Sequence, residues 1–134
     1  MAYATFKDCE IDGTNVVQQW LQGQGGGVRG SFVALLSLLE NLAIRRWRDQ
    51  AGYQALRGRY RGLHEFKVSF APRPGRRKLR YRLGACRGTA RGTYIFLAGW
   101  IHDTDAPMKE GMELALERRR LIVTGEAKVV AHVE

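Results

Sequence analysis

The sequence predicts a single α+β domain, residues 1–134, built on a small antiparallel sheet. Three observations favour this fold class. The length of 134 residues is close to the commonest size of one domain and is enough to bury roughly two-thirds of the unfolded chain's surface. Apolar residues recur at helical spacing in the N-terminal third and near the C-terminus. Between those regions they recur at strand spacing, separated by turns, which gives the order strand, helix, helix, strand, strand, strand, helix.

The N-terminal segment is expected to form a strand followed by a short helix. Residues 4–11 alternate loosely between apolar and polar side chains, as a half-buried strand does, and Asp12-Gly13 is a turn signal. Thr14 or Asn15 can then cap a helix over residues 16–21, because a short polar side chain accepts hydrogen bonds from the first free backbone amides.

A glycine-rich segment separates this helix from a second, longer one. Residues 22–30 read QGQGGGVRG and formally contain GxGxxG, but a dinucleotide-binding loop needs a preceding strand, and here a helix precedes it. We therefore interpret this segment as a flexible connector and Ser31 as the N-cap of the second helix. Its apolar face recurs at i, i+3, i+4 and i+7 and consists of Phe32, Leu35, Leu36, Leu39, Leu42 and Ala43. The helix is expected to end in residues that suit the negative end of its dipole, namely Arg45, Arg46 and Arg48.

The middle of the chain predicts three consecutive strands that pair as an antiparallel meander. Residues 63–70 form the first, and the turn 71–75 follows because its two prolines exclude a strand interior. Residues 78–86 form the second strand and 87–92 the next turn. Residues 93–101 are apolar on both faces, so this strand is expected to be central in the sheet.

A final helix is expected after the meander. Its inward face consists of Met108, Met112, Ala115 and Leu116, and its possible caps are Asp103, Thr104 and Asp105. Gly125 is expected to end it. Residues 128–134 are compatible with either one more edge strand or a tail.

The positive charge of the chain is concentrated in its middle third. The net charge is +9, yet residues 57–91 hold twelve Arg and Lys against one acid, Glu65, while the rest holds ten basic and twelve acidic residues. A block of one sign on ordered elements attracts polyphosphates, and RNA is the favoured partner. A solvated basic face without a partner is the alternative. A disordered tail is not expected, because apolar residues at strand spacing interrupt the block.

Strand alternation predicts where part of this charge lies. In the strand 63–70 the phenylalanines face inward, so Lys67 points outward. In the strand 78–86 the same alternation sends Arg80 and Arg82 to that outer face. The two N-terminal helices are expected to cover the opposite face, which leaves a partly open cationic sheet surface suited to a phosphodiester.

Other features bound the function class. Cys9 and Cys86 show neither CxxC nor Cys/His spacing, so we expect two small buried hydrophobes, no metal site and no cofactor. The longest apolar run, 95–101, is far short of the roughly 20 residues that span a bilayer. The N-terminus lacks the apolar stretch of a secretory signal. We therefore expect a cytoplasmic protein without a membrane partner.

Four segments of the C-terminal half together carry a family resemblance. Residues 62–67 read GLHEFK, a basic strand is centred on Arg80, residues 95–101 form an apolar strand, and a helix covers 107–120. In this combination the chain resembles the RelE/ParE superfamily of bacterial toxins, within it the HigB or phage Gp49-like group, whose first segment is similar to G-L-x-E-[LF]-R. The resemblance implies a RelE-like fold.

The resemblance also implies a function. Most HigB-like proteins are toxins of type II toxin–antitoxin pairs, metal-independent and cofactor-free endoribonucleases that cleave mRNA on the ribosome through attack of the ribose 2′-hydroxyl. The implied partners are mRNA, the ribosome and a cognate antitoxin, a small helix-turn-helix protein. Lys67 and Arg80 would supply charge and His102 would move a proton. The side chains expected to bind RNA are Arg61, Arg76, Arg77, Lys78 and Arg82.

Two histidines and two other function classes stay open. His102-Asp103 stands where the family commonly has two lysines, so His102 is either a proton shuttle or a surface residue. Alternation places His64 on the buried side of its strand, where a structural role is favoured. The alternatives to an endoribonuclease are a non-cleaving ParE-like toxin acting on DNA gyrase and a basic RNA-binding or phage-derived module that lacks the chemistry.

Overall fold

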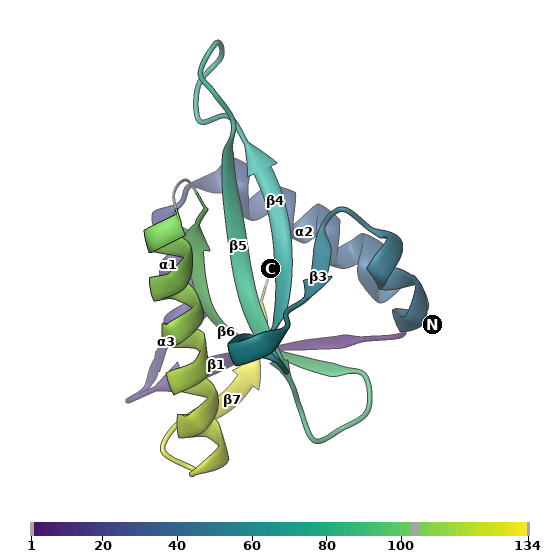
Figure 1. Ribbon diagram of the computed structural model, residues 1–134, viewed down its shortest axis with the longest axis vertical. Coiled ribbons are helices and arrows are strands. Elements are labelled where there is room, and N and C mark those ends of the chain that lie inside the picture. The colour runs from purple at the N-terminus through teal and green to yellow at the C-terminus, as the bar shows by residue number, and fades with distance from the viewer. Residues whose placement is uncertain (1, 103–104, 134) are drawn as a thin grey trace.

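The computed structural model describes residues 2–102 and 105–133 and confirms the α+β class (Figure 1). One seven-stranded sheet has the strand order β2-β1-β6-β5-β4-β3, with β7 also paired to β1. The strands are β1 (Thr5–Ile11), β2 (Thr14–Asn15), β3 (Tyr53–Ala55), β4 (His64–Phe70), β5 (Leu79–Arg87), β6 (Thr93–Ile101) and β7 (Lys128–Ala131). The helices are α1 (Val16–Gly23), α2 (Gly26–Glu40) and α3 (Asp105–Val123), with short 3-10 helices η1 (Ile44–Asp49) and η2 (Gly58–Tyr60).

The strands β4, β5 and β6 form the expected antiparallel meander. Strand β6 lies between β5 and β1, so it is central as its two apolar faces predict. Its pairing with β1 is parallel, and the chain between them supplies the long crossover that a parallel pair needs. On its other side β1 pairs antiparallel with β7, so the first and last strands of the chain are neighbours in the sheet.

The helices cover both faces of the sheet. Strands β1, β4, β5 and β6 share one core with α1 and α2, to which the helices contribute Val17, Leu21, Val28, Phe32, Leu36 and Leu39. On the other face α3 packs against β5 and β6 through a second core that includes Leu63, Leu97 and Ala115. Figure 1 shows α3 in front of β6 and α2 behind β4. Part of the α3 face, over β4 and the start of β5, thus remains outside the helical layer.

The first helix begins as the sequence predicts. The Asn15 side chain accepts hydrogen bonds from the amides of Val17 and Gln18, which satisfies two otherwise free donors of α1. The preceding turn has positive φ at Asp12 (51°) and Gly13 (79°), the geometry of a tight hairpin between two twisted strands.

The second helix begins earlier than predicted. Helix α1 runs to Gly23 and α2 starts at Gly26, so only residues 24–25 of the glycine-rich segment connect the helices, and the interpretation of residues 22–30 as a flexible connector is wrong. Ser31 lies inside the helix, and its hydroxyl donates to the carbonyl of Gly27 rather than capping. A Cβ on Gly27 would lie 2.1 Å from Cζ of Phe70. Glycine is thus required where α2 crosses β4 at close range.

The same helix also ends earlier than predicted. Helix α2 stops at Glu40, and Arg45, Arg46 and Arg48 lie in η1. Trp47 anchors η1, because its buried indole Nε1 donates to the carbonyls of Leu39, in the last turn of α2, and Leu42, just after the helix, each at 3.0 Å. The three arginines therefore do not complement the dipole of α2.

Two edge strands complete the sheet. Strand β3 was not predicted, and β7 shows that part of the open segment 128–134 is a strand. Strand β7 is fastened by His132, whose Nδ1 lies 2.7 Å from Oδ1 of the fully buried Asp8. Asn15 and Gln18 donate to the same carboxylate. These contacts join β7 to the first core through polar groups that satisfy one another.

The last helix and the cysteines follow the prediction. Met112 and Ala115 of α3 are buried and Met108 and Leu116 are half-buried, and Gly125 follows the helix at φ 80°. Two of the possible caps, Asp103 and Thr104, lie outside the described residues; α3 begins at Asp105. The thiols of Cys9 and Cys86 are buried and unpaired. No helix in the described ranges is long and apolar enough to cross a bilayer.

His64 has a structural position on the inner face, as alternation predicts. Its ring packs edge-on against Tyr94, and its Nδ1 lies 2.6 Å from the hydroxyl of Tyr53. Burial raises the pKa of Tyr53 to about 12, so that hydroxyl stays protonated and donates. The pKa of His64 is lowered to about 4, mainly by burial and secondly by the charge of Arg87. The imidazole is therefore neutral and accepting at pH 7.

We expect His64 to weaken the folded state in mild acid. The unfolded chain binds a proton near pH 6.5 that the folded chain binds only near pH 4, so stability falls as the pH falls through that window. Because the ring is only partly shielded from solvent, the expected loss is about 1 to 2 kcal/mol. Urea unfolding at pH 7 and pH 4.5 measures it. The variant His64→Phe should lose less stability than the parent over that interval; parallel declines would contradict the assignment.

Candidate nucleic-acid interface

The open part of the α3 face brings together the three side chains expected to be catalytic. Lys67 of β4 pairs with Arg82 of β5, and Ser69 pairs with Arg80 two residues further along, on the same face of the sheet. The backbone amide of His102, directly after β6, donates to the carbonyl of Arg80 at 2.7 Å. Since paired residues project to the same side of a sheet, Lys67, Arg80 and His102 occupy one surface.

The two cations on this surface differ in exposure. Arg80 is exposed, and no carboxylate among the described residues pairs with it. Lys67 is half-buried, and its Nζ donates to the side-chain oxygen of Gln54 at 3.2 Å. Lys67 and Ser69 line a shallow hollow of about 300 Å³ with Arg82 at its floor. The hollow is thus lined by Lys67, which its hydrogen bond to Gln54 holds in place, and Arg80 lies on the neighbouring strand outside the hollow.

Arg82 does not have the solvent-facing position expected of an RNA-binding residue. It is 7% exposed and pairs with Glu65, which is 5% exposed, at 3.3 Å between Nε and Oε1. That contact is an ion pair without hydrogen-bond geometry, since Nε has no hydrogen-bond acceptor. Burial raises the pKa of Glu65, which the positive charge of Arg82 opposes. The pair therefore holds two charges beneath the surface.

The sequence analysis noted Glu65 as the one acid of the basic block but did not predict a role for it, although a signal was present. It is the one acid between residues 57 and 91, among twelve basic residues. A carboxylate in such a position has a strong electrostatic reason to pair with one of them. The structure assigns Arg82 as that partner.

His102 lies at the edge of this surface, beside Arg82. Its ring Nδ1 is 3.5 Å from Nη2 of Arg82, at the outer limit of a hydrogen bond. A guanidinium only donates, so Nδ1 is the acceptor in this contact. The neighbouring Asp103 lies outside the described residues. The contact with Arg82 orients the imidazole and leaves Nε2 for another partner.

The remaining expected RNA-binding residues fall into two separate places. Arg76, Arg77 and Lys78 are exposed in the loop between β4 and β5, which projects beyond the sheet (Figure 1). Arg61 lies before the other end of β4, and its carbonyl accepts from Nη1 of Arg119. The length of β4 alone is roughly 23 Å at about 3.3 Å per residue. The loop cations extend the surface that contains Arg80, whereas Arg61 belongs elsewhere.

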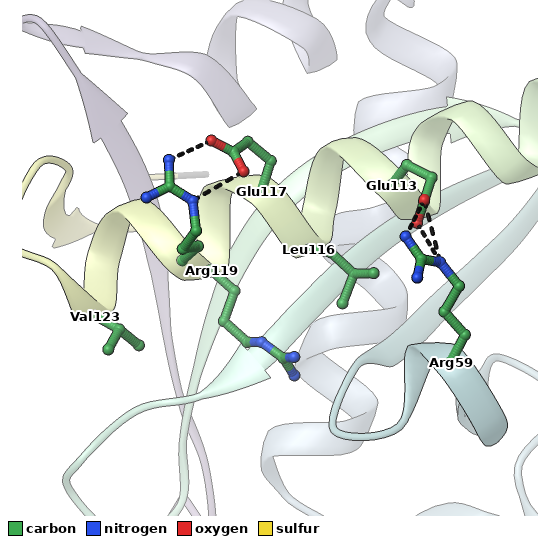
Figure 2. Close-up of a pocket in the computed structure, with 7 residues that line it drawn as sticks. Arg59, Glu113, Leu116, Glu117, Arg119 and Val123 are labelled. Carbon is green, nitrogen blue, oxygen red and sulfur yellow. Dashed lines mark hydrogen bonds and ion pairs between the residues drawn. The ribbon is translucent and has the colours of Figure 1, made fainter.

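The hollow beside Arg61 is larger, but most of its positive charge is neutralised by glutamates. It measures about 640 Å³ and lies along α3. Figure 2 shows Arg59 directed at Glu113, and a second ion pair joins Arg120 to Glu117. Hydrogen bonds from Arg59 lower the pKa of Glu113. Because its two glutamates pair with two of its three arginines and leave only the charge of Arg119, this hollow offers less net charge to a phosphate than the surface of Arg80 does.

The chemistry available on the Arg80 surface is charge stabilisation and proton movement. It holds two ammonium or guanidinium groups and one imidazole. Both thiols are buried in the second core, beneath α3, with pKa values raised by burial, that of Cys86 to about 11, so neither provides a thiolate nucleophile near pH 7. Comparisons with protein-family models, with curated proteins and with solved structures found no match to this chain.

Proposed function

We propose that the protein is a toxin of the RelE/ParE superfamily, a metal-independent endoribonuclease that cleaves mRNA on the ribosome and acts in the cytoplasm. The observation that carries the proposal is the convergence of Lys67, Arg80 and His102 on one open sheet surface. The exposed loop cations extend that surface at one end. An antiparallel meander with two N-terminal helices on one face also agrees with the arrangement that the resemblance implies.

In the proposed reaction the ribose 2′-hydroxyl attacks the adjacent phosphate, and the 5′-oxygen of the next nucleotide leaves. The products are a 2′,3′-cyclic phosphate and a 5′-hydroxyl. Arg80 and Lys67 stabilise the negative charge that develops on the phosphorane. Nε2 of His102 donates a proton to the leaving 5′-oxygen, and a water molecule takes the proton of the attacking 2′-hydroxyl. The buried pair of Arg82 and Glu65 orients His102 from below and does not itself contact RNA.

One observation favours a second candidate, a protein that binds without cleaving. Burial of Arg82 against Glu65 leaves the surface with fewer free cations than the sequence suggests. A ParE-like toxin that inhibits DNA gyrase, or a basic RNA-binding module, needs no phosphorane stabilisation. Induced expression followed by mapping of mRNA 5′ ends separates the two. New 5′-hydroxyl ends within translated codons support the endoribonuclease, and intact mRNA during growth arrest supports the non-cleaving toxin.

An antitoxin completes the proposal. A free cationic surface is best neutralised by an acidic segment of a partner, and the proposed partner is a small helix-turn-helix protein encoded beside this one. Co-expression of that protein should relieve growth arrest. Arrest that persists at equal expression of both proteins would count against the pair.

RNA binding is expected to depend steeply on salt. For single-stranded RNA the slope of log affinity against log salt is about −0.7 for each phosphate engaged. Replacing Arg76 and Lys78 together with alanine should make the slope about 1.4 less negative if each engages one phosphate. Fluorescence anisotropy with a labelled oligoribonucleotide between 50 and about 200 mM salt measures this. Arg29→Ala, exposed on α2, is the matched control; an equal slope in the double variant and the parent would contradict the loop contacts.

A further inference from the structure

A second cationic region lies at the far end of the sheet. Two adjoining hollows there measure about 420 and 480 Å³ and share Ile44, Arg91 and Gly92 as walls. The first is also lined by Arg87 and Tyr94, and the second by Arg45 and Tyr3. Each has a volume in the range of small-ligand sites. Together they form one continuous groove across the loop between β5 and β6.

This groove is remote from the Arg80 surface. Arg87 and Arg80 both belong to β5, and seven residues of extended strand separate them by roughly 23 Å. Arg87 pairs with Tyr94, whose ring belongs to the core shared with α1 and α2. Arg87 thus projects on the face opposite the Arg80 surface. A ligand in the groove would not touch Lys67 or His102.

The arginines of the groove carry uncompensated charge. Arg45, Arg87 and Arg91 are exposed, and no ion pair to a described carboxylate involves them. Neither hollow has an acidic residue in its lining. The guanidinium of Arg87 lies 5.9 Å from the centre of the Tyr94 ring, which limits its orientations without neutralising it. Three positive charges from distant parts of the chain therefore line one groove that has no acidic residue, and such a groove attracts an anion.

An exposed aromatic ring lies at the other end of the groove. Tyr3 is 56% exposed, although its backbone is fixed by a hydrogen bond to the carbonyl of Glu40 at 2.6 Å. The amide of Thr5 donates to Gly92, and a Cβ on Gly92 would lie 2.8 Å from the carbonyl oxygen of Tyr3. The chain segment that carries the ring is thus pressed against the loop that carries Arg91. Cations interleaved with an accessible aromatic are the combination that binds single nucleotides of a strand.

We propose that this groove is a second binding site, which takes one nucleotide unit with its phosphate between Arg87 and Arg91 and its base stacked on Tyr3. Arg45 lies where the adjoining phosphate of a longer strand would pass. The same phosphate and base chemistry is supplied by a free nucleotide or by single-stranded RNA. The site does not depend on the proposed endoribonuclease activity.

The test uses the full chain and three probes: inorganic phosphate, ADP and a fluorescent five-nucleotide RNA. Calorimetry measures phosphate and ADP, and anisotropy measures the RNA. The variants are Arg91→Ala, Tyr3→Ala and Tyr3→Phe. Arg48→Ala is the matched control, because Arg48 is an exposed arginine of η1 outside both hollows. Thermal unfolding of each variant checks that it folds.

Arg91→Ala should weaken nucleotide binding about tenfold or more, the loss expected for hydrogen bonds to a charged group. Tyr3→Ala should weaken it roughly 5-fold to 150-fold, the range of a lost base stack, whereas Tyr3→Phe should bind as the parent does. Arg48→Ala should bind as the parent does. Binding of ADP to the parent identifies a free nucleotide as a ligand of the groove. If the Arg91→Ala and Tyr3→Ala variants weaken binding of the RNA probe alone, the ligand is single-stranded RNA.

The proposal is overturned if Arg91→Ala binds both ADP and RNA as tightly as Arg48→Ala does. It is also overturned if ADP and RNA bind no better than inorganic phosphate, since the base then contributes nothing. Arg80→Ala distinguishes the two proposals of function: nucleotide binding in the groove should persist in that variant, whatever happens to mRNA cleavage.

Discussion

Replacing Glu65 with alanine is expected to destabilise the protein by about 3 to 5 kcal/mol, because Arg82 is left as a buried and unpaired charge. Arg82 is 7% exposed and its Nε is 3.3 Å from the carboxylate, so neither water nor another described acid takes the place of Glu65. For a domain of this size the melting temperature should fall by roughly 10 to 20 °C. Urea unfolding monitored by tryptophan fluorescence gives the free energy directly.

Two controls make this result specific to the buried pair. The exposed pair of Arg59 and Glu113 is broken by Glu113→Ala, which should leave stability unchanged within error because solvent screens that pair. Replacing Glu65 with leucine and Arg82 with methionine together removes both charges, and should recover most of the stability lost in Glu65→Ala. If Glu65→Ala unfolds at the same urea concentration as Glu113→Ala, the buried pair does not stabilise this fold.

Local sequence patterns predicted the helices and strands whose apolar residues recur at a regular spacing. The apolar stripe that includes Phe32, Leu36 and Leu39 is buried against the sheet, because a helix with one apolar face has one way to bury it. The meander followed from period-2 alternation and from turns that contain proline and glycine. These signals lie within a few residues of one another, so no knowledge of distant segments was needed.

The helix boundaries depended on contacts that no local pattern contains. Glycines before Ser31 resemble a linker in isolation, yet Gly27 lies in α2, and Phe70, more than forty residues later, packs into the space that a side chain at Gly27 would fill. Helix α2 ends where Trp47 turns back to cap its carbonyls. In both cases tertiary packing overrides the local preference of the chain.

The sequence predicted on which face of the sheet the candidate site lies but not how deeply its side chains are buried. Alternation correctly sent Lys67, Arg80 and Arg82 to one side of the sheet. It could not show that Arg82 lies in the row between Lys67 and Trp100, where neighbours on both sides and Glu65 exclude water. The groove of Arg45 and Arg91 was missed because these residues are far apart in the sequence. The fold brings them together beside the N-terminal segment.

Substitutions of Arg80 and His102 are expected to give different kinetic signatures. Arg80→Ala should slow mRNA cleavage by roughly a hundred to a thousandfold, or about 2.7 to 4 kcal/mol, because a charge that stabilises the phosphorane is lost. His102→Ala should slow it by about 10² to 10⁴ if its Nε2 moves the proton. Ribosome binding should weaken more in Arg80→Ala, since only the arginine also attracts the phosphates of the ground state.

Single-turnover cleavage on programmed ribosomes measures the chemical step, and pelleting with ribosomes measures binding. Arg29→Ala, on the face that bears α2, is the control for a general loss of positive charge. A parental cleavage rate in His102→Ala beside a slow Arg80→Ala would make His102 a surface residue and assign the proton transfer elsewhere. Among the described residues of this surface, only Arg80 offers an exposed charge without a carboxylate partner, and only His102 offers an imidazole. If neither variant is slower than the parent, the endoribonuclease proposal is therefore wrong and the non-cleaving toxin takes its place.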